Sequence, residues 1–295
     1  MKPKIKRGWI RVIIFFISLI IVFIASKIIL QIAVQLTHFE AGFEYKILIS
    51  EAFTVLFVIL LVYLFRRYLD RKSLISLGFD YHGKLKDMIY GGVLGFLLMG
   101  IGFIVLLLLG NLEITQITFD PIFLMVIFLG LFVAAILEEI VFRGYMLNNL
   151  MESFNNYIAL GITAVLFGLV HSFNPNFTIL GLINIILGGW FFGLYYVYQK
   201  NLWFPIVLHL SWNFFQGPIF GFAVSGEEEG SDFLIQHQLE GSHLLTGGKF
   251  GFEGSIILTV LLLILIIGMH YYFRKRPQTP LSVVPEDLSP SGKLD

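Results

Sequence analysis

Long apolar runs separated by short polar segments dominate the hydrophobic pattern of the chain. Val12–Ser26, Leu48–Phe65 and Ile256–Ile267 are examples. With its flanking residues, each run approaches the roughly 20 residues that cross a bilayer as a helix. The runs do not alternate over about 10 residues, as the strands of an outer-membrane barrel do. The pattern therefore predicts an all-α protein, a polytopic bundle of transmembrane helices.

Eight segments fit the length of a span. They are residues 9–35, 47–65, 88–110, 122–151, 157–173, 178–198, 201–218 and 254–273. Lysine and arginine are concentrated in the connecting segments 66–87 and 274–295, whereas the segments on the other side contain only Lys46 and Lys249 among many acidic residues. Because Lys and Arg are enriched in cytoplasmic loops, this distribution predicts that both termini are cytoplasmic.

The composition agrees with a membrane protein and narrows its chemistry. Apolar residues make up 57% and charged residues 14% of the chain, compared with roughly 45–50% and about 25% in soluble globular proteins. The net charge is zero, so nothing in the charge balance indicates a nucleic-acid partner. The absence of cysteine excludes disulfides, thiolate metal sites and cysteine nucleophiles. We expect the lipid bilayer to surround this protein, and we expect no nucleic-acid partner.

The spans and loops divide the chain into five predicted parts. These are a two-span N-terminal segment 1–69, a membrane core 70–218, an extracytoplasmic loop 219–253, a last span 254–276 and a disordered cytoplasmic tail 277–295. The loop is rich in Gly, Glu and Ser and is expected to be mobile. The tail is rich in Pro and Ser, which is typical of disorder. Because no soluble domain is predicted, any chemistry must lie among the helices.

Glycines recur at a spacing of four within the predicted spans, as in the pairs Gly91 and Gly95, and Gly189 and Gly193. Small residues at this spacing allow helix backbones to approach closely within a bilayer. We interpret both pairs as helix-packing positions without a chemical role.

Two adjacent glutamates, Glu138 and Glu139, lie inside the fourth predicted span. Ionisable residues within a membrane cost free energy and by default indicate function. Arg143 follows Glu139 by four residues, the spacing at which opposite charges pair on a helix, while Glu138 projects about 100° away. Capping of a helix end at the membrane surface is the alternative, but the helical pattern continues to Met151. We predict a structural Glu139–Arg143 pair and a free base at Glu138.

His171 lies one helical turn after Phe167 in the next span, which places an aromatic ring beside the imidazole. A lone histidine in a bundle is more often a core residue than a functional one, but its depth argues for function. Glu138 lies 13 residues before the end of its span at Met151. His171 lies 14 residues after the start of its span at Tyr157. At 1.5 Å per residue, both groups lie roughly 20 Å from the same end of two antiparallel helices, so they can meet.

His209 and Asn213 form a third pair, spaced by four residues in the seventh predicted span. This spacing places the imidazole and the amide on one face of the helix. Hydrogen bonding between helices is the alternative role.

A further hypothesis concerns Lys27 and Glu51, which lie at equal depth on the first two spans and are interpreted as a structural ion pair. The alternative is that Lys27 extends its ammonium group outward along a polar stripe.

The motifs EExxxR, FxxxH and HxxxN, in this order and in separate spans, resemble the CPBP family of intramembrane proteases. This family includes CAAX proteases and bacteriocin-processing proteins and is also called the Abi family. The matching residues are Glu138, Glu139, Arg143, Phe167, His171, His209 and Asn213. The stretches RKSLISLGF (71–79) and GWFFGLYYVYQKNLW (189–203) are also similar to the family, so the resemblance covers about residues 70–215. Each motif alone is weak, whereas the ordered set is specific.

The resemblance implies an intramembrane endopeptidase that hydrolyses peptide bonds of substrates at the membrane. Glu138, with His171 beside it, would activate a water that attacks the scissile carbonyl. His209 and Asn213 would donate hydrogen bonds to the developing oxyanion. The Glu139 ion pair would hold the base in position.

The sequence leaves the participation of a metal open. Glu138, His171 and His209 are ligand types that could form an open catalytic zinc site. The chain lacks HExxH, in which two ligands share one helix face, and Asn213 is a poor zinc ligand. We favour a metal-free mechanism on these grounds.

Two other functions are compatible with the same residues. A proton-coupled transporter also uses intramembrane Glu, His and Arg, although no inverted repeat or pair of broken helices is visible. A non-catalytic bacteriocin-immunity or sensor protein could carry the same motifs.

We expect a multi-pass protein of a bacterial plasma membrane, since no eukaryotic sorting signal is present. Its site is expected to open toward the cytoplasmic half of the membrane or laterally to lipid.

Overall fold

The structure, a computed structural model, describes residues 3–37, 43–227 and 233–275. Its α-helices are α1 (Gly8–Thr37), α2 (Phe43–Leu64), α3 (Leu85–Leu108), α4 (Pro121–Glu139), α5 (Asn148–Leu150), α6 (Asn156–His171), α7 (Ile179–Gln199), α8 (Trp203–Phe214), α9 (His243–Thr246) and α10 (Ile256–Arg274). Three π-helical segments extend these helices, namely Phe65–Asp70, Ile140–Leu147 and Phe215–Ile219. Three short 3₁₀ turns are Ile75–Leu77, Gly248–Phe250 and Phe252–Gly254.

Each of the eight predicted spans overlaps at least one of these helices, and the span 122–151 overlaps both α4 and α5, which confirms the all-α, polytopic fold class. Within the part of the chain that the structure describes, six helical stretches are long and apolar enough to cross a membrane. They are Gly8–Ile32, Ala52–Asp70, Leu85–Leu108, Pro121–Leu150, Ile179–Gln199 and Ile256–Arg274. Helices α6 and α8 are shorter than these six. The chain is thus a multi-pass membrane protein, while the cytoplasmic location of its termini stays a prediction.

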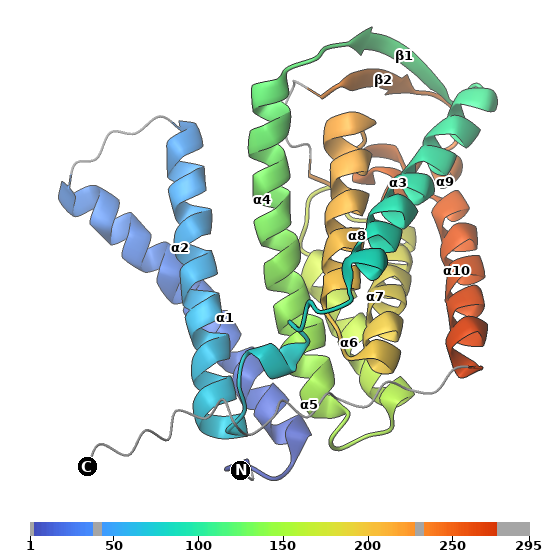
Figure 1. The fold of residues 1–295 in the computed structure, drawn as a ribbon. Helices are drawn as coiled ribbons and strands as arrows, with labels where there is room; N and C mark the ends of the chain where they lie inside the picture. The colour runs from blue at the N-terminus through green and yellow to red at the C-terminus, as the bar shows by residue number, and fades with distance from the viewer. Residues whose placement is uncertain (1–2, 38–42, 228–232, 276–295) are drawn as a thin grey trace, which may run out of the picture.

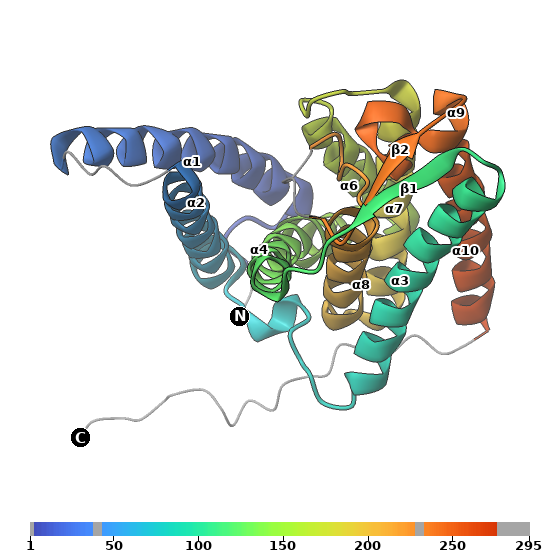
Figure 2. The ribbon, with the colours of Figure 1, turned by 90° about the horizontal axis from the view of Figure 1, so that it is seen from above.

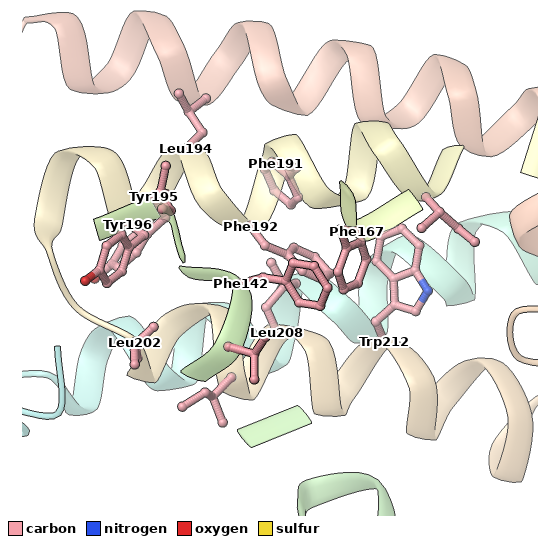
Figure 3. Close-up of a cluster of buried hydrophobic side chains, with 14 of the residues drawn as sticks. Phe142, Phe167, Phe191, Phe192, Leu194, Tyr195, Tyr196, Leu202, Leu208 and Trp212 are labelled. Atoms are coloured by element: carbon pink, nitrogen blue, oxygen red, sulfur yellow. The ribbon is translucent and has the colours of Figure 1, made fainter. Parts of the chain in front are cut away.

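The helices fall into a main bundle and an N-terminal pair. Figure 1 shows α3, α4, α6, α7, α8 and α10 gathered together, with α1 and α2 leaning away from them. The same separation is visible from above in Figure 2. Helix α7 lies at the centre of the bundle. In its most apolar stretch 61% of the residues are buried, compared with 17% in α1 and in α10. Aromatic side chains from α6, α7, α8 and the segment after α4 fill the core (Figure 3).

The predicted glycine pairs lie at the closest helix contacts, as expected. A Cβ atom on Gly95 of α3 would lie 2.8 Å from the backbone nitrogen of Trp212 on α8, and one on Gly91 would lie 2.8 Å from the carbonyl oxygen of Phe204. On α7, a Cβ on Gly189 would lie 3.2 Å from Cα of Ala164 in α6. Side chains at these positions would push the helices apart, which confirms the packing interpretation.

A small β-sheet, which the sequence did not predict, closes one end of the molecule. Strand β1 (Leu112–Ile117) pairs antiparallel with β2 (Ile235–Leu239), with an irregularity between Ile114 and Gln116. Figure 1 shows this sheet at the end opposite to the start of α1 and the end of α10.

The described parts of the loop 219–253 contain secondary structure that the sequence did not predict, while the mobility of the loop stays a prediction. Besides β2 they contain α9 and two 3₁₀ turns. Phe250 and Phe252 are 1% and 0% exposed, and the ring of Phe252 occupies the space beside Gly102 of α3. Apolar residues therefore pack the described parts of this loop against the bundle, although its composition is rich in glycine and polar residues.

A buried ion-pair cluster attaches the N-terminal pair to the bundle near the other end. Asp70 accepts hydrogen bonds from Arg11 at 2.7 Å and from Arg66 at 3.0 Å, and all three residues are at most 1% exposed. Arg11 also pairs with Glu152, which follows α5, and Lys72 contacts the same carboxylate at 2.8 Å. The cluster thus joins α1, the end of α2 and the end of the α4–α5 segment.

Two earlier predictions fall outside what the structure describes. The side chain of Glu51 lies outside the described side chains, so its proposed pairing with Lys27 stays a hypothesis. Lys27 itself lies 5.5 Å from the centre of the Phe23 ring. The tail 277–295 lies beyond the described residues.

Candidate active site

The three motifs come together where α4, α6 and α8 approach one another. Asp120 starts α4 by accepting hydrogen bonds from the backbone of Ile122 and Phe123, and Pro121 occupies the first turn. Asn155 caps α6 in the same way. These caps fix where each helix begins and therefore the depth at which its functional side chain lies.

Glu138 faces both motif histidines. Its Oε2 atom lies 3.9 Å from Nε2 of His171 and 3.9 Å from Nε2 of His209. These distances are too long for direct hydrogen bonds, but one water molecule could contact all three groups. The same oxygen is buried and accepts no hydrogen bond from any described residue. The predicted meeting of carboxylate and imidazole is thus present, with space for a small ligand between them.

Glu139 is fully buried and paired, in contrast to Glu138, whose side chain is 34% exposed. Its Oε1 accepts a hydrogen bond from Nη1 of Arg143 at 2.7 Å, so the predicted pair is present. Arg143 also donates from Nη2 to the carbonyl oxygen of Gly189 on α7 at 3.1 Å. Its guanidinium lies 4.5 Å from the centre of the Phe167 ring. These contacts compensate the burial of both charges.

His209 makes a contact that the sequence did not predict. Its Nδ1 lies 3.1 Å from Oε1 of Glu139, the oxygen that also binds Arg143. An ionised carboxylate only accepts hydrogen bonds, so Nδ1 carries the hydrogen. The Nε2 atom, which faces Glu138, therefore has a lone pair in the neutral ring and donates only in the imidazolium form.

His171 is oriented by its own helix. Its Nδ1 lies 2.8 Å from the carbonyl oxygen of Phe167, so the hydrogen again lies on Nδ1 and Nε2 points toward Glu138. The ring centres of His171 and Phe167 are 4.6 Å apart, which confirms that the ring lies beside the imidazole. Phe167 thus separates Arg143 from His171 while it touches both.

The site residues line a cavity with a volume of about 330 Å³. Its motif residues are Glu138, Phe167, His171, His209 and Asn213. Asn213 follows His209 by one turn of α8, and both line the same cavity, as predicted.

Residues from two connecting segments also line the cavity. Asn174, from the α6–α7 connection, and Val224, Ser225, Glu227 and Glu253, from the loop after α8, form this part of its wall. The predicted topology places these two connections outside the cell, so their presence in the wall disfavours an opening toward the cytoplasmic half. Glu138 lies near the middle of the α4–α5 stretch, while His171 ends α6 at the start of the α6–α7 connection. The other expectation, a lateral opening to lipid, stays a prediction.

The donor set is chemically suited to a metal, although its spacing is wide. Both imidazoles direct Nε2 toward Glu138 and hold the Nδ1 hydrogen on a carboxylate or a carbonyl, the arrangement typical of metal-bound histidines. Ligands of a tetrahedral zinc are roughly 3.4 Å apart for bonds of about 2.0–2.1 Å, whereas the separations here are 3.9 Å. Among the described residues, no three acidic or histidine side chains form a metal-ligand cluster at the observed positions.

The sequence also missed residues that shape the site without belonging to a motif. Phe192 of α7 lies with its ring centre 5.3 Å from that of His209, and Glu253 forms part of the cavity wall. The former is one of 31 phenylalanines, and the latter lies in a loop far from the motifs. Phe192 lies within the family-like stretch 189–203, but neither residue belongs to one of the three motifs.

The chain is similar to known proteins in the segment that contains the three motifs. Residues 120–215 match the family described as "Type II CAAX prenyl endopeptidase Rce1-like". The chain is similar to a Bacillus subtilis (strain 168) protein named "Putative membrane peptidase YdiL", with 32% identity over 118 residues. This alignment covers 40% of the chain and 43% of that relative, so the chain spans less than half the length of the curated relative it matches. No solved structure matches the chain.

Proposed function

We propose that this membrane protein is an intramembrane endopeptidase, because its motif segment, residues 120–215, matches the family described as "Type II CAAX prenyl endopeptidase Rce1-like". The observation that supports this most directly is the unsatisfied Oε2 of Glu138, which lies 3.9 Å from each of two imidazole nitrogens. Hydrolysis requires a water held beside a base, and these three groups enclose a position for one.

In the proposed reaction, Glu138 and the Nε2 atom of His171 accept the two hydrogens of the water. Glu138 removes one proton as the oxygen attacks the scissile carbonyl, and then delivers it to the departing amine. The imidazolium form of His209 and the amide of Asn213 donate hydrogen bonds to the oxyanion. Glu139 supports this form of His209 by accepting its Nδ1 hydrogen at 3.1 Å.

If a metal is bound, Glu138, His171 and His209 would hold it. It would supply Lewis-acid polarisation of the carbonyl and lower the pKa of a bound water. The remaining residues would keep their positions: Asn213 on the oxyanion, and Arg143 on Glu139.

The function is tested by assaying the purified protein in proteoliposomes against a mixture of membrane-anchored peptides, with cleavage read by mass spectrometry. We expect Glu138→Gln to lower the rate about 10²- to 10⁴-fold, because the general base is lost. Asn213→Ala should lower the rate about 10²- to 10³-fold, because an oxyanion donor is lost. Glu113→Gln serves as the control, since Glu113 is an exposed residue of β1. Equal cleavage by wild type and Glu138→Gln would contradict the proposal.

The peptide mixture also addresses substrate class. It contains prenylated C-terminal peptides, unmodified transmembrane peptides and short amphipathic peptides, so preferential cleavage identifies the class. If Glu138→Ala leaves the cellular phenotype of the wild type intact, a non-catalytic immunity or sensor role is favoured. Proton uptake by proteoliposomes without peptide cleavage would favour a transporter.

Metal dependence has its own expected outcome. We expect the protein to retain most of its activity after treatment with a strong chelator and desalting, because 3.9 Å separations suit a bridging water better than a bound ion. Activity after chelation is compared with that of an untreated sample. A loss that added zinc restores would show that the three donors contract around a metal.

A further inference from the structure

Glu253 is a buried carboxylate in the wall of the catalytic cavity that belongs to none of the three motifs. It lies in the 3₁₀ turn Phe252–Gly254 directly before α10, is 6% exposed, and lines the same cavity as Glu138. It also lies outside the segment 120–215 that matches the protease family.

Both carboxylate oxygens of Glu253 are used. Oε1 accepts a hydrogen bond from the indole nitrogen of Trp212 at 3.2 Å. Oε2 accepts one from the backbone nitrogen of Ser225 at 2.5 Å and another from its hydroxyl at 2.9 Å. A buried carboxylate is costly unless such donors satisfy it. The three bonds therefore fix the carboxylate and connect α8 to the loop after it.

One arm of this arrangement leads to His209. Trp212 follows His209 by three residues on α8, and its ring packs edge-on against Phe192, with ring centres 5.7 Å apart. The Phe192 ring centre lies 5.3 Å from that of His209. Figure 3 shows Phe192 and Trp212 in the same aromatic cluster. The indole that Glu253 holds is thus part of the packing around the imidazole.

The other arm leads to His171. The carbonyl oxygen of Ser225 accepts a hydrogen bond from the side-chain amide of Asn174 at 3.1 Å. The backbone nitrogen of Asn174 donates to the carbonyl oxygen of His171, also at 3.1 Å. The loop that Glu253 holds is thus tied to the end of α6 that carries the second histidine.

The carboxylate is not needed to anchor the loop itself. The carbonyl oxygen of Glu253 accepts a hydrogen bond from Asn184 on α7 at 2.7 Å, and Phe252 beside it is fully buried. The N-terminal cap of α10 is formed by Ser255. The backbone at Glu253 thus keeps its place through other contacts, while the side chain reaches toward the site.

We propose that Glu253 is a positioning residue, which keeps His209 and His171 in register on either side of Glu138. This inference rests on the proposed peptidase function. A shift of either imidazole changes the distances to the attacking water and the oxyanion, and misplacement by about 1 Å can lower a rate about 100-fold. The carboxylate acts through Trp212 and Ser225 and does not touch the reacting atoms.

The test is Glu253→Gln, which keeps the size of the side chain. Its amide oxygen can accept from Trp212 or from Ser225, but its NH₂ group cannot accept from the other, so one arm is lost. We expect kcat to fall about 10- to 100-fold, while KM changes less than about threefold, because the loss concerns the transition state. Ser225→Ala, which removes only the hydroxyl bond, should have a smaller effect in the same direction.

Glu240→Gln is the matched control, since Glu240 is an exposed carboxylate of the same loop and does not line the cavity. We expect its kcat to stay within about twofold of the wild type. If Glu253→Gln does not fold, Trp212→Phe and Ser225→Ala each test one arm. A kcat unchanged in Glu253→Gln, or lowered equally in both glutamine variants, would overturn the inference.

An activity-independent measurement separates this inference from the proposed function. The chain has four tryptophans, so ¹⁵N-tryptophan labelling gives four indole N–H resonances, and Trp212→Phe identifies one of them. Glu253→Gln should move this resonance upfield as the bond weakens. If the resonance moves but neither the wild type nor any variant cleaves peptides, the proposed peptidase function is wrong, whereas the hydrogen bond between Glu253 and Trp212 is confirmed. If Glu138-dependent cleavage is present and Glu253→Gln leaves kcat unchanged, the positioning role fails.

Discussion

Arg143 holds more of the candidate site together than its motif position suggests. It binds Glu139 on its own helix, the carbonyl of Gly189 on α7, and the faces of Phe167 and Phe192. The Glu139 oxygen that binds Arg143 is the one that His209 contacts. A single buried carboxylate oxygen therefore links the motif on α4 to the motif on α8.

We expect Arg143→Met to be strongly destabilising. The change leaves Glu139 buried with one fewer donor, and removing one partner of a buried ion pair costs about 3–5 kcal/mol. The double variant Arg143→Met with Glu139→Gln removes both charges and should recover part of the stability. Thermal unfolding in detergent, followed by circular dichroism, provides the comparison. A double variant less stable than Arg143→Met alone would show that the charge on Glu139 is not the cause.

At the residue scale, the motifs predicted the ion pair and the meeting of Glu138 with His171, because helical spacing and depth follow from numbering alone. The bond from His209 to Glu139 did not follow from the sequence. It depends on the rotation of α8 about its axis, which packing against α3 and α7 decides. The residues of the Glu253 arrangement could not be predicted either, since their contacts connect a loop to helices that are distant in sequence.

At the scale of elements, α8 carries half of the site and is packed most closely against α3. Gly91 and Gly95 allow this approach, because a Cβ atom at either position would lie 2.8 Å from backbone atoms of α8. The position of His209 and Asn213 in the membrane is therefore determined in part by two glycines on another helix.

We expect Gly95→Ala to lower activity about tenfold or more while the helical content is kept. The added methyl group would lie 2.8 Å from the backbone of Trp212, so α8 must move. Gly92→Ala is the control on the same helix, because its methyl group would meet the side chain of Val207 at an ordinary 3.5 Å. Peptide cleavage normalised to folded protein is the measurement. Equal activity of both variants would mean that α8 tolerates the shift.

The helices themselves could be predicted from apolar runs, since a bilayer requires about 20 apolar residues in each span. The β1–β2 sheet could not. Its strands are five and six residues long and lie in two loops more than 100 residues apart, so neither has a local partner. The secondary structure in the described parts of the loop 219–253 was missed for a similar reason, because Phe250 and Phe252 become buried only when the bundle supplies their pockets.

At the scale of the whole molecule, the position of the cavity bears on which side of the membrane meets the substrate. The cavity wall includes Asn174, from the α6–α7 connection, and Glu227, from the loop after α8. Helix α1 begins and α10 ends at the end of the molecule opposite to the β-sheet (Figure 1). If the termini are cytoplasmic, as the distribution of Lys and Arg predicts, the loops that line the cavity face outward.

The absence of cysteine makes this orientation directly testable. Single cysteines at Glu227, Glu113 and Ser73 are treated in intact cells with a membrane-impermeant thiol reagent. We expect the reagent to label the cysteines at positions 227 and 113. Labelling should abolish activity only in Glu227→Cys, because the attached group would then occupy the cavity. Ser73→Cys, at the other end, should react only after permeabilisation. The reverse pattern of labelling would invert the predicted topology.

The buried cluster at Asp70 also bears on how the protein is assembled. Arg11, Arg66 and Asp70 all emerge with the first two spans, whereas Glu152 is synthesised about 80 residues later. At roughly 5–20 residues per second, the ribosome needs several seconds to supply it. During that interval Arg11 and Arg66 would have only Asp70 as an acidic partner in the cluster, and we expect the surplus positive charge to oppose translocation of this end. If the termini are cytoplasmic as predicted, the residues that later join two halves of the fold would also help to set its direction in the membrane while the chain is still growing.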